Sequence, residues 1–251
     1  MKSSSQALVV IVLALPFTLT LNGFSRQATS QQERYSRIEQ NVREALQSDR
    51  DTRRIEFSVE DHEITLRGQV QTFWVKNQAI KRTLAVPGVE TVVSELEIPV
   101  AENDNEVAQE VAKTISRYPN YTIWDHIDGR INNGNVTLTG RVTPDWNKAD
   151  DIFERVAKVK GVQDLQSSIR TLSPSQGDRN LRQAIASKVF SSSHFERVAS
   201  MQNPPFHIIV DNSVVTLVGY VQSNIELQEL QMIIAQTQGI LRVDNQLQAA
   251  Q

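Results

Sequence analysis

Three stretches of the chain share one pattern: ITLRGQV at 64–70, VTLTGRV at 136–142 and VTLVGYV at 215–221. Each stretch reads as an apolar residue, Thr, Leu, any residue, Gly, any residue and Val. The apolar side chains alternate along the stretch, which is typical of a strand with one buried face. Threonine is a β-branched polar residue that suits the other face. The pattern therefore predicts the same strand three times.

A second glycine follows the first at a nearly constant distance in every copy. The spacings are 20, 21 and 20 residues, and the pairs are Gly68 with Gly88, Gly140 with Gly161, and Gly219 with Gly239. We interpret these glycines as structural. The first of each pair lies inside a strand, where it would permit a bulge or the close approach of a helix. The second suits the left-handed position just past a helix C-terminus.

Apolar residues at helical spacing lie between the two glycines of each copy and predict an amphipathic helix. Apolar residues return at positions +1, +4 and +8 after the second glycine in all three copies, where we expect the last strand. The helical stripe comprises Ala79, Thr83 and Val86 in the first copy, Ile152, Val156 and Val159 in the second, and Leu230, Ile234 and Thr237 in the third.

Turn-forming residues precede each repeated strand and predict a hairpin with an upstream strand. Another amphipathic segment lies upstream of each hairpin. The predicted fold class is α+β, with three tandem αββαβ modules, each a three-stranded mixed sheet with two helices on one face. The upstream strands are expected at 55–59, 122–131 and 206–210, and the upstream helices at 38–46, 107–115 and 181–189.

Loop-forming residues separate the modules. The joins at 99–105 and 173–177 are short, so the modules are expected to be close neighbours. The expected domains are 33–99, 104–173 and 177–249.

The first 25 residues have the composition of an export signal. Lys2 gives a positive start, Ala7–Leu15 is an unbroken apolar run, and Gly23 and Ser25 have the spacing of positions −3 and −1 of a signal peptidase site. Residues 1–25 are therefore expected to be a signal peptide. The alternative is an uncleaved anchor of about the minimum spanning length. Both alternatives place the rest of the chain in the periplasm, free in the first case and anchored to the inner membrane in the second.

The composition excludes several function classes. A net charge of −3 over 251 residues argues against nucleic-acid binding, which needs an excess of Lys and Arg. The absence of cysteine excludes disulfides, thiol catalysis and cysteine-ligated metals. The four histidines are scattered without metal-ligand spacing, and no P-loop, Gly-x-Ser-x-Gly or dinucleotide-binding glycine motif occurs. We expect neither an enzyme nor a cofactor.

The repeated unit resembles the BON domain, the bacterial osmotically inducible and nodulation domain. The strand with its Thr-Leu-x-Gly-x-Val pattern, the helix and the segment GILRVDNQL at 239–247 carry the resemblance, which covers about residues 35–250 as three tandem domains. It implies an exported or membrane-associated module that binds phospholipid surfaces or exported protein clients. It also implies a role in envelope integrity and osmotic stress. The family offers no catalytic motif to transfer.

Basic residues on the helices between the paired glycines are candidate contacts for anionic lipid headgroups, although a solvated helix face would look the same. Trp74 and Trp146 each follow the first glycine by six residues and are candidate interfacial aromatics. The alternative is that they plug a core or a junction between modules. The basic candidates are Lys76, Lys81 and Arg82 in the first module and Arg155, Lys158 and Lys160 in the second.

These features predict a non-enzymatic binding protein of the cell envelope. Its expected partner is an anionic phospholipid surface or an exported or envelope protein. An alternative is a self-associating scaffold or ring component, because small α/β modules with free edge strands can pair between chains.

Overall fold

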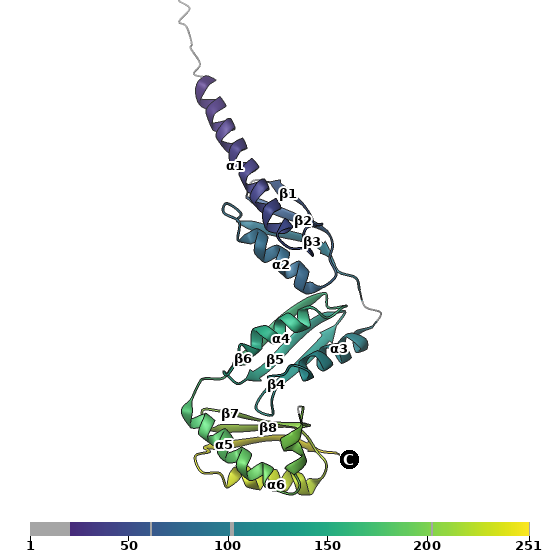
Figure 1. Ribbon diagram of the computed structural model, residues 1–251, viewed down its shortest axis with the longest axis vertical. Helices are drawn as coiled ribbons and strands as arrows, with labels where there is room; N and C mark the ends of the chain where they lie inside the picture. Colours follow the sequence, from purple (N-terminus) through teal and green to yellow (C-terminus); the bar gives the residue numbers. More distant parts are fainter. Residues whose placement is uncertain (1–20, 61, 101–102, 202, 251) are drawn as a thin grey trace, which may run out of the picture.

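A computed structural model describes residues 21–60, 62–100, 103–201 and 203–250. The predicted signal peptide lies outside the described residues up to position 20, and residues 21–25 begin a helix. No helix in the described ranges is both long and apolar enough to cross a bilayer. Figure 1 shows three α/β units following one another along the long axis of the molecule.

Each unit has the same order of elements: helix, strand, strand, helix, strand. Module one comprises α1 (Leu21–Gln47), β1 (Glu56–Glu60), β2 (Glu63–Gln69), α2 (Phe73–Leu84) and β3 (Thr91–Glu97). Module two comprises α3 (Asp104–Ser116), β4 (His126–Asn132), β5 (Asn135–Val142), α4 (Lys148–Ala157) and β6 (Asp164–Thr171). Module three comprises α5 (Gln176–Phe190), the 3-10 helix η1 (Glu196–Ser200), β7 (Phe206–Asp211), β8 (Val214–Val221), α6 (Asn224–Ala235) and β9 (Arg242–Ala249).

The repeated strand is the middle strand of a three-stranded sheet in every module. β2, β5 and β8 pair antiparallel with the strand before them and parallel with the strand after the helix. The predicted class, α+β with three tandem modules and mixed sheets, is confirmed.

Each module has its own hydrophobic core between one face of its sheet and its two helices. In module one, α1 contributes Ile38, Val42 and Leu46, which share one helix face because they are four residues apart. The side chains of β2 that alternate toward this face are Ile64 and Leu66, and both are fully buried. The helical stripe between the glycines, predicted from the sequence, is buried in all three modules.

The second glycine of each pair lies in a turn four residues beyond the helix end, and not directly at the helix C-terminus as expected. In module one, the amide of Val89 donates to the carbonyl of Val86 at 3.1 Å, and Gly88 has a φ of 94°. Proline followed by a residue of positive φ is the arrangement of a type II turn, which favours glycine at that position. The turn redirects the chain from the helix into the parallel strand.

The first glycine permits the close approach of a neighbouring strand, where a helix had been expected. A Cβ atom on Gly140 would lie 2.1 Å from the carbonyl oxygen of His126 on β4. Gly219 has the same relation to Pro205, at 2.4 Å from its carbonyl oxygen. Gly68 has nothing within 4 Å of such a Cβ atom, so the close approach is confined to modules two and three.

Modules one and two meet through the first turn of α2. Phe73 belongs to the margins of both cores, and its ring lies edge-on to Phe153 of α4 at 6.4 Å between centroids. Trp74 also packs against the core of module two.

Modules two and three meet through residues 121–125, which we call the docking segment. The sequence predicted a strand beginning at 122, but β4 begins at His126 because the preceding residues close a turn instead. Ile123 enters the core of module three, and its carbonyl oxygen accepts the amide of Ile208 at 2.7 Å. β7 is an edge strand, so the docking segment satisfies an amide that the sheet leaves unpaired.

Candidate functional site

Four of the six predicted headgroup contacts already interact with other groups of the same chain. Lys76 donates to the carbonyl of Leu96 at 3.1 Å, and Arg82 forms a 2.8 Å ion pair with Asp49. The two remaining engaged residues lie on aromatic rings: the guanidinium of Arg155 is 5.1 Å from the ring centroid of Tyr118, and Nζ of Lys158 is 5.2 Å from that of Trp74.

Lys81 and Lys160 differ from the other basic candidates because they have no partner in the described part of the chain and are exposed. Lys160 lines a shallow depression at the join between modules one and two, together with Pro99 and Val100. Glu106 and Glu110 line the same depression, so it is not uniformly basic.

The two candidate tryptophans have different surroundings. Trp74 lies at the junction of modules one and two, against the core of module two. The side chain of Trp146 is 62% exposed, just before α4. Only Trp146 is therefore free to contact an external surface.

A buried ion pair holds the docking segment to module two. Nζ of Lys148 lies 2.7 Å from Asp125, and these residues are 2% and 0% exposed. Thr143 completes the cluster, because its backbone amide and hydroxyl both donate to Asp125. The Thr122 amide and hydroxyl donate to the other carboxylate oxygen. All these bonds are internal and both charged side chains are buried, so we describe the cluster as a structural clamp.

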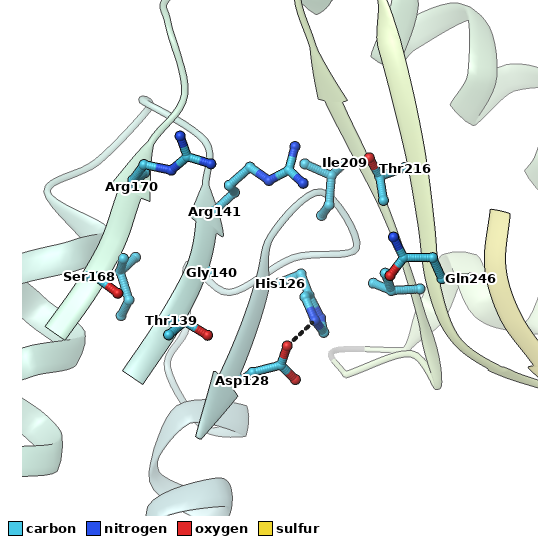
Figure 2. A pocket seen from close by; sticks show the side chains of 12 residues that line it. His126, Asp128, Thr139, Gly140, Arg141, Ser168, Arg170, Ile209, Thr216 and Gln246 are labelled. Atoms are coloured by element: carbon cyan, nitrogen blue, oxygen red, sulfur yellow. Dashed lines mark hydrogen bonds and ion pairs between the residues drawn. The ribbon is translucent and has the colours of Figure 1, made fainter. Parts of the chain in front are cut away.

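A cleft of about 530 Å³, lined by both polar and apolar groups, lies between the sheets of modules two and three (Figure 2). The β4-β5-β6 sheet presents its helix-free face to the cleft. Along each strand, the residues that point to this face alternate with the residues that point into the core, and most of them are polar. The wall from module three is partly apolar. The lining from module two includes His126, Asp128, Thr139, Arg141, Ser168 and Arg170, and that from module three comprises Ile209, Thr216, Val218 and Gln246.

Three basic side chains line up across the module two sheet. His126 is the register partner of Arg141, and Arg141 is the register partner of Arg170. We call His126, Arg141 and Arg170 the basic row. Neighbouring strands are about 4.8 Å apart, so the three side chains leave the same face side by side. In Figure 2 the two guanidinium groups extend toward the same end of the cleft, away from Asp128.

The acidic groups near the basic row neutralise only part of its positive charge. Asp128 bonds the imidazole of His126 at 3.1 Å. Asp211 of module three comes no closer than 4.0 Å to Arg141, beyond hydrogen-bonding distance. Arg170 is exposed and has no hydrogen bond or ion pair with any described residue. The row therefore contains one cation with no partner and another that is weakly paired.

His207 of β7 lies beside the row at the junction. Its ring centroid is 5.8 Å from that of His126 and 5.3 Å from that of Tyr121. Burial and, secondarily, the neighbouring His126 lower the pKa of His207 to about 4. Its Nδ1 atom is buried and has no hydrogen-bond partner among the described residues. The imidazole is therefore neutral at neutral pH.

The sequence interpretation missed the basic row, because it treated His126 only as one of four scattered histidines and did not single out Arg141 or Arg170. A signal for the pair was present: the repeat aligns the strand at 136–142 with the strand after Gly161. Parallel pairing of these strands brings Arg141 beside Arg170. No group of three or more His, Asp or Glu side chains in the described ranges is placed to hold a metal ion.

Comparisons with solved structures find distant similarities. Two structures of CdsD, a structural protein of the type III secretion system of Chlamydia trachomatis, are 15% and 16% identical to this chain with TM-scores of 0.25. The aligned parts cover 84% and 85% of this chain and 96% and 93% of the CdsD chains. The PrgH periplasmic domain is 10% identical with a TM-score of 0.20, over 83% of this chain and 99% of that one. Scores this low establish no common arrangement of the whole chain.

The comparison with curated proteins finds no match. The comparison with family models finds the BON domain three times, at residues 36–99, 103–170 and 178–251. Each match contains one helix-strand-strand-helix-strand unit with its own three-stranded sheet. The matches cover most of the sequence, so the chain belongs to the BON domain family.

Proposed function

We propose that the chain is a non-enzymatic, periplasmic binding protein of the cell envelope that contacts anionic phospholipid surfaces or exported proteins through its BON modules. The observation that carries the proposal is the threefold family match over most of the chain. The export-like composition of residues 1–25 supports the location.

The free groups on modules one and two support lipid contact. Lys81 and Lys160 are unpaired within the described residues, and Trp146 is exposed. A lysine near an anionic membrane contributes about 1 kcal/mol, and an indole ring favours the interfacial region. With so few free groups, binding should be weak and should decrease as salt screens the charges.

Co-sedimentation with vesicles tests the lipid contact. The chain from residue 26 should sediment with vesicles that contain anionic lipid and should stay in solution with zwitterionic ones. The triple variant Lys81→Gln, Lys160→Gln, Trp146→Ala should lose sedimentation. Lys113→Gln, which removes an exposed lysine paired with Glu110, is the matched control. Equal binding to both kinds of vesicle, or none to either, would rule out the anionic-lipid branch and leave a protein partner.

Self-association as a scaffold is the second candidate. β3, β6 and β9 each pair with one neighbour only, so each presents a free edge. The bond from Ile208 to Ile123 shows that an edge of this fold accepts additional backbone. Analytical ultracentrifugation over a concentration series should then reveal assemblies. A monomeric mass up to high micromolar concentration would count against the scaffold.

A further inference from the structure

The basic row has an electrostatic cost that no described contact removes. Arg141 and Arg170 are directly opposite each other on neighbouring strands. Like charges in this relation destabilise a sheet. Arg170 lacks a partner, and Arg141 has only the distant carboxylate of Asp211. An anion between the two guanidinium groups would turn this repulsion into attraction.

Module one provides an internal comparison. On its helix-free face, Arg67 lies between its register partners Glu56 and Glu95. Arg67 forms a 2.7 Å ion pair with Glu95, so its charge is balanced within the same sheet. In module one the cross-strand arginine therefore has carboxylates as register partners, whereas in module two Arg141 and Arg170 are register partners of each other.

Neutral donors lie beside the row and face the same way. Thr139 and Ser168 are register partners one step further along the face, two residues before the arginines. The hydroxyl of Ser168 has only a long 3.4 Å contact to the carbonyl of Leu138. Both arginines and both hydroxyl residues therefore line the cleft, with the two guanidinium groups at one end of it (Figure 2).

We infer that the basic row binds a phosphate group in the cleft between modules two and three. Arginine forks match the oxygens of phosphate and carboxylate in paired hydrogen bonds. Several donors in one area favour a group with three or four acceptor oxygens, such as phosphate, over a carboxylate with two. The module three wall limits access from one side. The inference does not depend on the proposed envelope function, because it is argued from the charges and geometry of the cleft alone.

Calorimetric titration of the intact chain with inorganic phosphate at constant ionic strength tests the site. Near pH 7 a phosphate group carries between one and two negative charges. Arg170→Gln and Arg141→Gln should each weaken binding by about tenfold or more, because each removes charge-assisted hydrogen bonds. Arg130→Gln is the matched control. Arg130 lies on β4 and points to the same face of the sheet as the basic row, but it does not line the cleft. Acetate should bind more weakly than phosphate.

Thermal unfolding gives a second readout. Phosphate should raise the Tm of the wild-type chain and should raise that of Arg170→Gln by clearly less at the same concentration. Without phosphate, Arg170→Gln should be at least as stable as the wild type, because the substitution removes a like-charged neighbour. Absence of phosphate binding by both methods would overturn the inference, as would an equal loss of affinity in Arg130→Gln.

Vesicles distinguish the source of the phosphate group. If it belongs to a lipid headgroup, Arg170→Gln will reduce sedimentation with anionic vesicles and inorganic phosphate will compete. If it belongs to a soluble compound, Arg170→Gln will sediment like the wild type and will still lose affinity for inorganic phosphate. Failure of all vesicle binding would contradict the lipid branch of the proposed function and leave the phosphate titration as the test of this site.

Discussion

At the scale of single residues, two aspartates near helix N-termini bind the hairpin turns of their modules. Asp104 accepts the amides of Asn133 and Gly134 at 2.7 and 2.8 Å, and Asp178 accepts those of Asn212 and Ser213 at 3.0 and 2.9 Å. Each aspartate lies three positions before the first buried apolar residue of its helix, Val107 in α3 and Leu181 in α5. The sequence did not reveal these aspartate–amide hydrogen bonds, because they join residues about 30 positions apart. In module one the same position is Tyr35.

Gly140 and Gly68 occupy the same repeat position in different surroundings. Alanine at either position is strained by the positive φ, but only at 140 would it also meet the backbone of the neighbouring strand. Gly140→Ala should therefore cost about 1–3 kcal/mol more stability than Gly68→Ala. Urea unfolding of both variants measures the difference. Equal losses would show that the strand approach is not close.

Lys148 is the buried cation of the clamp on the docking segment. Lys148→Met should lower stability by about 3 kcal/mol, because it leaves the fully buried Asp125 without its counter-charge. The control Lys113→Met removes an exposed pair with Glu110 and should change stability by less than about 1 kcal/mol. Similar small losses for both variants, measured by urea unfolding, would argue against a buried pair.

At the scale of elements, local patterns predicted the modules well and the joints poorly. The alternation at 64–70 and the stripe at Ile152, Val156 and Val159 each report one buried face, so strand and helix followed directly from them. The strand expected from 122 failed because Ile123 is buried by module three and not by its own sheet. An apolar residue in a sequence does not say which module buries it. The basic row was not predicted for a related reason: its three residues become neighbours only through the register of β4, β5 and β6, which a single strand pattern does not give.

The junction of modules two and three contains an imidazole, that of His207, whose pKa is lowered by burial. His207 has a pKa of about 4 in the folded chain and near 6.5 when unfolded, so between these values the unfolded state binds the extra proton. Stability should fall as pH drops from about 6.5 to about 4, by up to about 3 kcal/mol. The rings of Tyr121 and His126 lie against that of His207; the charge of His126 opposes protonation, and the more distant charge of Asp125 favours it.

Thermal unfolding of the wild type and His207→Gln between pH 7 and pH 4 checks this expectation. The variant should show a smaller decrease in Tm over that range, since it has no imidazole to protonate at this position. Parallel curves for the two proteins would mean that His207 is accessible to protons in the folded chain.

At the scale of the whole molecule, three similar modules have acquired different surfaces. Module one pairs the arginine of its sheet face with Glu95, and module two carries the basic row. Module three provides a wall of the cleft and the edge strand that bonds to the docking segment. The free lysines Lys81 and Lys160 and the exposed Trp146 belong to modules one and two. We therefore expect lipid contact in the first two modules and a supporting or protein-binding role in the third.

Amide NMR of the chain from residue 26, titrated with lipid nanodiscs with and without anionic lipid, tests this division directly. With anionic lipid, the perturbed signals should cluster around Lys81, Trp146 and Lys160, and the α6 and β9 signals of module three should remain unchanged. Perturbations centred on module three, or none in any module, would contradict the assignment of lipid binding to the BON modules one and two.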